Sequence, residues 1–284
     1  MFEDGDFEVK EACPWCESKR YTLEYIGKYN VPVLRCKDCG LVYSKKILNS
    51  TGLNKYWSHY ESQVHSYDEQ AVNKRKIMYK VEKNYILNFM SDKKSILDIG
   101  CGDGSFMDLF SEEGYSCIGV EYGKEAAEIA SQKHKVYLGD FIELEIKEKF
   151  DLIIFRGTIQ YMLKPKKYLE KAINLLNDNG MIFITSSPNA NSFCFKLFKE
   201  NFSLPVSVTD YYAFNENLLS DFFYNAGLVL LDSKWFYKET PYADICRDEN
   251  IVKKALECKK MQKKIDFPSP PFYDTMLSLV YKKL

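Results

Sequence analysis

The stretch from Ser95 to Phe106, SILDIGCGDGSF, constrains the fold of this chain more than any other. It begins as a buried strand, passes through three glycines and continues with a helical pattern. A strand that runs into a glycine turn and a helix leaves backbone N–H groups free for a ligand, and glycines let that ligand approach closely. The stretch therefore predicts a nucleotide-binding turn.

The spacing of the glycines indicates which nucleotide this turn suits. Gly100, Gly102 and Gly104 follow the pattern G-x-G-x-G, whereas a nicotinamide-binding turn has G-x-G-x-x-G. Asp98 lies inside the strand just before the turn. Its carboxylate would repel a pyrophosphate but would suit a cationic ligand such as S-adenosylmethionine, which carries an ammonium and a sulfonium group.

Two further acids end the next two predicted strands. Glu121 closes the second strand about 20 residues on, where an acid can bind both ribose hydroxyls. Asp140 ends the third strand and can accept a hydrogen bond from an adenine amino group, and the neighbouring Phe141 can pack on the adenine ring. Each acid alone is better explained as an ordinary strand-end residue. Three acids on three successive strands, together with the glycine turn, favour a cofactor site.

The chain from Ser95 onward alternates between strand and helix patterns. Because such alternation is typical of a parallel sheet covered on both faces, we expect an α/β fold. The expected strands are 95–100, 116–121, 135–140, 150–156 and 181–187, followed by late strands at 229–237 and 276–284. The expected helices are 105–114, 124–134, 165–180 and 215–227, with a further helix before the turn at 70–90.

These segments, in this order and spacing from about 95 to 240, resemble class I S-adenosylmethionine-dependent methyltransferases. The resemblance implies a Rossmann-like sheet of seven strands, the last antiparallel, with helices on both faces. It also implies that the cofactor is bound by residues of the glycine turn and of the strand ends. Those residues are Asp98, Gly100, Cys101, Gly102, Gly104, Glu121, Tyr122, Asp140, Phe141 and Arg156.

Four cysteines near the N-terminus form two C-x-x-C pairs. Cys13 and Cys16 are separated by nineteen residues from Cys36 and Cys39, which is the spacing of structural zinc sites. Four thiolates close a tetrahedral shell and leave no open position for catalysis. The alternatives are four unligated thiols, or a redox role for one pair.

A subset of these methyltransferases carries an N-terminal ribbon with a CGLVY-like sequence, which this chain resembles at residues 39–43. That resemblance implies tailoring of polysaccharides, sugars or small metabolites. It divides the chain into a zinc ribbon at 1–45, a Tyr-rich helical connector or lid at 46–90 and a methyltransferase domain at 91–284. We expect the ribbon and the sheet domain to have separate cores.

The residues that would act on the acceptor depart from the family pattern. Relatives often carry Glu-His after the fourth strand, where this chain has Gln160-Tyr161, and a further His before the C-terminal helix, where it has Tyr211 and Tyr212. We expect these three tyrosines to position the acceptor. Tyrosine is a poor base at its ordinary pKa near 10.

The histidines and Arg156 leave alternatives open. His59 and His65 lie in the connector, and His59 is a candidate base or a solvated loop residue; His134 is expected at the surface. Arg156 ends the fourth strand, where it could clamp a phosphate or carboxylate or pair with a nearby acid.

The charge and hydropathy of the chain narrow the function further. The net charge of −1 argues against a nucleic-acid partner, and no apolar run is long enough to span a membrane. The N-terminus has no apolar core, so we expect a cytoplasmic protein. The sequence predicts methyl transfer to a small or carbohydrate-like acceptor. There are two alternatives. One is an RNA methyltransferase whose ribbon binds the RNA, and the other is a catalytically silent binding or scaffold protein.

Overall fold

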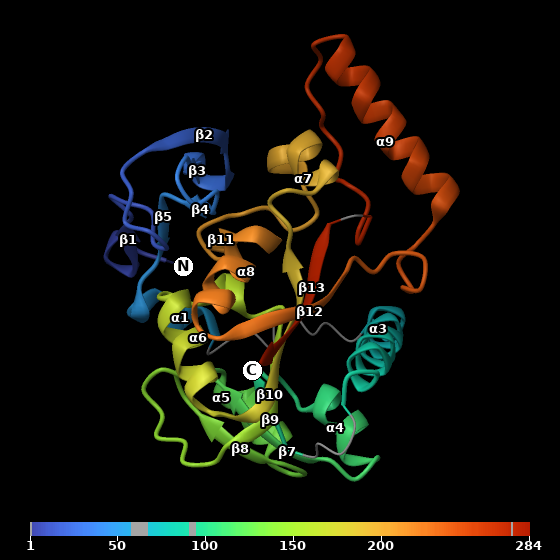
Figure 1. The fold of residues 1–284 in the computed structure, drawn as a ribbon. Helices are drawn as coiled ribbons and strands as arrows, with labels where there is room; N and C mark the ends of the chain where they lie inside the picture. Colours follow the sequence, from blue (N-terminus) through green and yellow to red (C-terminus); the bar gives the residue numbers. More distant parts are fainter. Residues whose placement is uncertain (1, 58–67, 91–94, 274) are drawn as a thin grey trace.

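The computed structural model describes residues 2–57, 68–90, 95–273 and 275–284. At its centre lies a seven-stranded sheet with the strand order β12-β13-β10-β9-β6-β7-β8 (Figure 1). Its strands are β6 (Ser95–Ile99), β7 (Ser116–Glu121), β8 (Lys135–Leu138), β9 (Phe150–Arg156), β10 (Leu176–Pro188), β12 (Leu228–Lys234) and β13 (Met276–Lys283). Strand β13 is antiparallel to both of its neighbours, β10 and β12, while β6 runs parallel to β7 and β9. The predicted α/β sheet with an antiparallel last strand is confirmed.

Alternate residues of the central strands face two different cores, which explains their continuous apolar runs. Ile96 and Ile154 pack in one cluster with residues of α3 (Glu69–Leu87) and α4 (Ser105–Ser111). Leu97 and Phe155 pack in another cluster with residues of α6 (Pro165–Asn174) and α8 (Glu216–Asn225). Helices therefore cover both faces of the sheet, as expected (Figure 1).

Two predicted helices end four or more residues early in the structure. The helix expected at 165–180 ends at Asn174, because Leu176 already pairs with Phe150 as the first residue of β10. The register then shifts, so that Met181 pairs with Leu152. Helix α5 (Lys124–Ala130) was expected to reach residue 134. In both cases the helical pattern of the sequence continues beyond the residue at which the helix ends.

The N-terminal unit is built on a sheet of four described strands with the order β11-β4-β3-β2. Its strands are β2 (Tyr21–Ile26), β3 (Pro32–Cys36), β4 (Val42–Ser44) and β11 (Tyr212–Ala213), and a separate pair joins β1 (Phe7–Val9) to β5 (Lys46–Leu48). Strand β11 comes from much later in the chain than the other three, and Tyr212 pairs with Tyr43.

The cores of the two units are continuous, which corrects the expectation of separate cores. Cys13, Trp15 and Cys36 lie in the same cluster of buried residues as Leu97 and Phe155 of the central sheet. The ring of Trp15 meets Phe214 edge to face at 5.8 Å. The ribbon is therefore packed against the sheet domain and does not stand apart from it.

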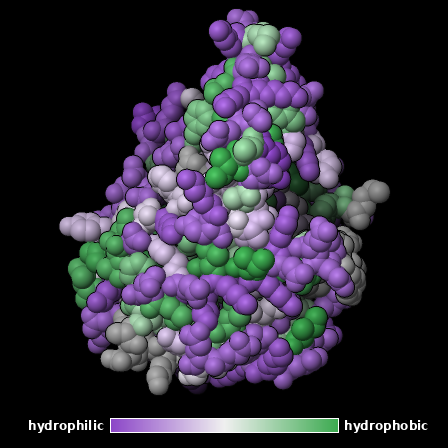
Figure 2. Space-filling view, turned by 90° about the vertical axis from the view of Figure 1, so that its right-hand side faces the viewer, coloured by the Kyte–Doolittle hydropathy of each residue, from purple (hydrophilic) through white to green (hydrophobic). Residues whose placement is uncertain are grey.

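The remaining elements surround these two sheets. They are α1 (Ser50–Trp57), α7 (Phe193–Phe198), α9 (Ile245–Lys260) and the 3-10 turns η1 (Asp4–Asp6), η2 (Lys28–Asn30), η3 (Ile159–Tyr161) and η4 (Lys199–Asn201). Helix α9 projects away from the central sheet (Figure 1), and the face seen in Figure 2 is mostly hydrophilic with small apolar patches. In the described part of the chain, no helix is long and apolar enough to cross a membrane.

Candidate active site

A cavity of about 410 Å³ opens at the carboxyl ends of β6, β7 and β9. This is where ligands bind in open α/β sheets, and the volume falls in the usual range for small-ligand sites. Ten of the residues singled out in the sequence line it: Asp98, Gly100, Cys101, Gly102, Glu121, Tyr122, Asp140, Phe141, Arg156 and Tyr161. Residues that the sequence singled out separately therefore lie together around one cavity and form part of its wall.

The three glycines of the turn have positive φ angles, which favour glycine over other residues. A Cβ added to Gly100 would lie 2.3 Å from the Cγ2 atom of Thr158, so this position leaves no room for a side chain. A Cβ on Gly102 would meet nothing within 4 Å, which leaves its backbone open to a ligand. Gly104 is the N-cap of α4 and packs near Ala130, so it shapes the turn without lining the cavity.

Asp98 is the most unusual polar group in the cavity. Its side chain is buried, and its Oδ1 atom has no hydrogen-bond partner among the described residues. Burial raises the pKa of Asp98 to about 7; the charge of Arg156 opposes this rise and that of Glu121 adds to it. A buried carboxylate oxygen without a donor is stabilised by a ligand that brings a cationic N–H group, as the ammonium of S-adenosylmethionine would.

Glu121 joins the glycine turn to the loop after β7. Its Oε2 accepts from the backbone N–H of Gly102 at 2.8 Å, and its Oε1 accepts from the backbone N–H of Gly123 at 2.7 Å. Each carboxylate oxygen can accept a second hydrogen bond, so the group fits a ligand with two adjacent hydroxyls. The residues present therefore fit the ribose of the expected cofactor.

Asp140 and Phe141 form the far wall of the cavity with a residue that the sequence analysis missed. The Oδ1 of Asp140 accepts from the backbone N–H of Ile142 at 3.1 Å and from the hydroxyl of Tyr168. Burial, and next the bond to Asp140, raise the pKa of Tyr168, which stays protonated. Tyr168 lies on α6, far from the glycine motif in sequence, so only its helical burial pattern could have indicated it.

Arg156 pairs with a buried acid of α3, which confirms the second of its two alternatives. Its Nε donates to the Oε2 of Glu82 at 2.6 Å, and Glu82 is fully buried. The guanidinium carbon lies 4.3 Å from the ring centroid of Tyr79. Arg156 still lines the cavity, but its Nε–H group already donates to Glu82.

The expected acceptor tyrosines separate into two groups. Tyr161 lines the cavity, and its ring meets Trp57 edge to face at 5.5 Å. Tyr211 and Tyr212 are fully buried, and neither belongs to the described residues that line the cavity. The expectation that these two position the acceptor is wrong for this cavity, because both rings lie in the core that the ribbon shares with the sheet domain.

The histidines contribute little to the described site. His59 and His65 lie outside the described residues. The side chain of His134 is largely covered and its Nε2 lies 2.8 Å from Asp108 Oδ1, so its expected surface position is wrong.

Four aromatic residues outside the cofactor motifs complete the open side of the cavity. Trp57 ends α1, Tyr79 lies on α3, and Tyr242 stacks on Phe272 with ring centroids 4.9 Å apart. In the sequence, the Tyr-rich composition around Trp57 was the only feature that pointed to an aromatic wall. These rings offer flat apolar surfaces in the wall of the cavity.

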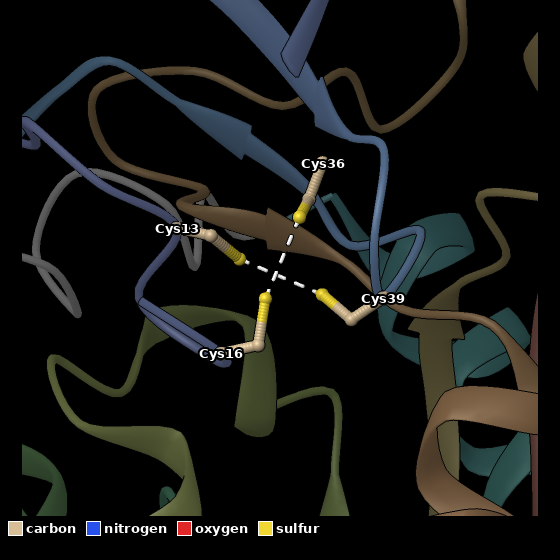
Figure 3. Close-up of side chains that lie close together, drawn as sticks. All are labelled: Cys13, Cys16, Cys36 and Cys39. Carbon is tan, nitrogen blue, oxygen red and sulfur yellow. Dashed lines mark hydrogen bonds between the residues drawn. The ribbon is translucent and has the colours of Figure 1, made fainter. Parts of the chain in front are cut away.

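The four cysteines of the ribbon converge on one point (Figure 3), with their sulfurs all within 4.8 Å of one another. The sulfurs of Cys13 and Cys39 are 3.5 Å apart, as are those of Cys16 and Cys36. Tetrahedral Zn–S bonds of about 2.3 Å place sulfurs about 3.8 Å apart, so the residues fit a zinc ion. Among the residues the structure describes, no other group of His, Cys, Asp or Glu has this arrangement. None of the four lines the cavity.

Two solved structures of methyltransferases illustrate the likeness in fold. A methyltransferase from Thermotoga maritima has a TM-score of 0.54 and 19% identity, over 80% of this chain and 100% of that one. A Haloferax volcanii complex of the Trm112 methyltransferase activator with a methyltransferase has a TM-score of 0.57 and 13% identity, over 81% and 98%. At these identities the likeness establishes the fold.

Curated relatives match part of the chain. A ubiquinone biosynthesis O-methyltransferase from Pelagibacter ubique is 27% identical over 152 residues, which cover 47% of this chain and 63% of that protein. EEF1A lysine methyltransferase 2 from Danio rerio is 28% identical over 133 residues, which cover 40% and 57%. The chain thus spans about 60% of the length of these two relatives. The model of the methyltransferase domain family matches residues 70–232, which is more than half of the chain, and the protein therefore belongs to that family.

Proposed function

We propose that this protein transfers a methyl group from S-adenosylmethionine to a hydroxyl of a small or carbohydrate-like acceptor. The observation that carries the proposal is Asp98, a buried carboxylate with an unsatisfied oxygen beside an open glycine turn. A pyrophosphate would be repelled by this carboxylate, whereas a cationic cofactor would neutralise it.

In this proposal, different residues of the cavity bind different parts of the cofactor. Asp98 binds the ammonium, Glu121 the ribose hydroxyls, and Asp140 with Phe141 the adenine; Gly100, Cys101, Gly102 and Tyr122 form the wall against which the nucleoside lies. The bound cofactor supplies a methyl carbon activated by the sulfonium. The protein then has to hold the acceptor in line, exclude water and receive a proton.

The aromatic side of the cavity supports the choice of acceptor. Trp57, Tyr161, Tyr242 and Phe272 present flat surfaces on which sugar rings and planar metabolites pack. A polymeric nucleic acid would need a basic surface around the cavity, and the chain has a net charge of −1. A small acceptor is therefore favoured over RNA.

The ribbon has a structural role in this proposal. Cys13, Cys16, Cys36 and Cys39 hold one zinc ion in a closed shell, away from the cavity. Residues 1–45, 46–90 and 91–284 remain the proposed ribbon, connector and methyltransferase units. The shared core means that the zinc stabilises the whole assembly.

Binding and label transfer test the function in two steps. Calorimetry with S-adenosylmethionine, S-adenosylhomocysteine and NADH should show binding of the first two and none of the third. Methyl-labelled cofactor should then transfer label to the small-molecule or glycan fraction of a cell extract and leave the RNA fraction unlabelled. Label in RNA would favour the RNA alternative, and cofactor binding without any transfer would favour the scaffold. Binding of NADH alone would refute the proposal.

A further inference from the structure

Glu82 is a fully buried acid of α3 whose side-chain partners come from two strands, β9 and β10. It lies on α3, before the glycine turn in sequence, and its Oε2 accepts from Nε of Arg156 at the end of β9. Its Oε1 accepts from the hydroxyls of Thr185 at 2.8 Å and Ser186 at 2.7 Å, both on β10. A buried carboxylate with this many charge-assisted and hydroxyl contacts has one defined orientation.

The same helix holds Arg156 from a second side. Tyr79 lies one turn before Glu82 on α3, and its ring centroid is 4.3 Å from the guanidinium carbon. The ring centroid of Phe106 on α4 is 5.7 Å from that carbon. Arg156 is therefore fixed between two rings and one carboxylate, with part of its side chain in the wall of the cavity.

A fixed guanidinium in this wall opposes the proposed cofactor. S-adenosylmethionine carries one net positive charge from its sulfonium, whereas S-adenosylhomocysteine is a thioether with no net charge. An uncancelled Arg156 would repel the methyl donor and leave the demethylated product almost unaffected. The Oε2 of Glu82, only 2.6 Å from Arg156 Nε, cancels this charge at close range.

We propose that Glu82 is a positioning residue that neutralises Arg156 and thereby sets the preference of the cavity for S-adenosylmethionine over S-adenosylhomocysteine. This inference rests on the proposed function, since it assumes that these two compounds occupy the cavity. It assigns the α3 segment a part in cofactor selection, beyond covering the sheet. A purely structural Glu82 would affect the binding of both compounds equally.

The test compares the affinities of both compounds by calorimetry in the full-length protein. Glu82→Gln keeps the size of the side chain and removes its charge. We expect S-adenosylmethionine to bind roughly tenfold more weakly, because one uncancelled positive charge would then lie in the wall of the cavity. S-adenosylhomocysteine should change by less than about threefold. Glu69→Gln, at the exposed start of the same helix, is the matched control and should change neither affinity.

Two further variants keep the inference testable if Glu82→Gln folds poorly. The double variant Glu82→Gln with Arg156→Met removes both charges, and replacing a buried pair by uncharged residues is often tolerated. In this double variant, the ratio of the affinity for S-adenosylmethionine to that for S-adenosylhomocysteine should return to within about twofold of the wild-type ratio. Arg156→Met alone should leave the ratio at or above the wild-type value.

Two results would overturn the inference. One is an unchanged ratio of the affinity for S-adenosylmethionine to that for S-adenosylhomocysteine in Glu82→Gln, whether or not both compounds bind more weakly; the other is a fall of this ratio in Arg156→Met. Failure of the wild-type protein to bind either compound would instead refute the proposed function.

Discussion

Replacing Asp98 by Asn should stabilise the cofactor-free protein and weaken its cofactor binding. Asp98 is buried, and its Oδ1 lacks a partner among the described residues, so its charged form is costly in the empty cavity. Asn has nearly the same shape and carries no charge. The variant therefore shows separately how much the carboxylate destabilises the folded protein and how much it contributes to cofactor binding.

The size of the effect follows from the pKa of Asp98, which burial raises from 3.8 to about 7. Because the folded-state pKa lies above the unfolded value, folding favours the protonated form, and this advantage is lost as the pH rises from about 4 to about 7. One pKa unit corresponds to about 1.4 kcal/mol. The charged group should thus lower the free energy of unfolding by about 2 kcal/mol at pH 5 and about 4 kcal/mol at pH 8.

Urea unfolding of both proteins at pH 5 and pH 8 measures this difference. The stability gained by Asp98→Asn should grow by roughly 2–3 kcal/mol between the two pH values. In the wild-type protein, S-adenosylmethionine should bind about eightfold more tightly at pH 7.5 than at pH 6, because binding needs the ionised carboxylate. In Asp98→Asn the binding should be weaker and nearly independent of pH.

Opposite behaviour would refute this reasoning. A destabilised Asp98→Asn protein at pH 8 would mean that the carboxylate has an unseen partner in the free protein. A stability gain that does not grow with pH would mean that Asp98 does not titrate in this range.

Three further predictions concern the other parts of the molecule. Glu121→Ala should weaken binding of S-adenosylmethionine by about 1–3 kcal/mol, measured by calorimetry, because charge-assisted hydrogen bonds are lost; an unchanged affinity would remove Glu121 from the site. Metal analysis should find close to one zinc per chain, and Cys36→Ser should lose it and lower the melting temperature of the whole protein by at least about 5 °C, since the ribbon shares its core with the sheet; a metal-free, fully stable wild-type protein would contradict the zinc site. Tyr161→Phe should lower turnover with the labelled acceptor by about tenfold or less if Tyr161 only positions it, whereas a loss of a hundredfold or more that follows a titrating group would make it a base.

The half of the cavity that the glycine turn and the strand-end acids form was predictable from the sequence because its residues follow from local rules. Glycine spacing and the acids at the ends of three parallel strands place Asp98, Glu121 and Asp140 along one edge, and the structure brings them around one cavity. Nothing more than the order of strands and the shared direction of their ends is needed for this result.

The other half depends on packing between distant segments, which periodicity does not reveal. Arg156 could be placed at a strand end, but its partner Glu82 is 74 residues earlier in the chain. Tyr211 and Tyr212 were expected beside the acceptor, yet both are buried where the segment that includes β11 packs against β4. Tyr168 and the ring pair Tyr242–Phe272 likewise reach the cavity through tertiary contacts.

The pairing of Tyr212 with Tyr43 also determines the order of events during biosynthesis. The two residues are separated by 169 positions, so a ribosome that adds about 5–20 residues per second completes β11 roughly 10–30 s after β4. Throughout that interval the edge of β4 lacks its neighbour and remains a template for other strands. The cysteines precede β4, so a nascent chain can meet zinc before its sheet closes. Early metal capture would then hold the N-terminal hairpin in register until the last strand arrives.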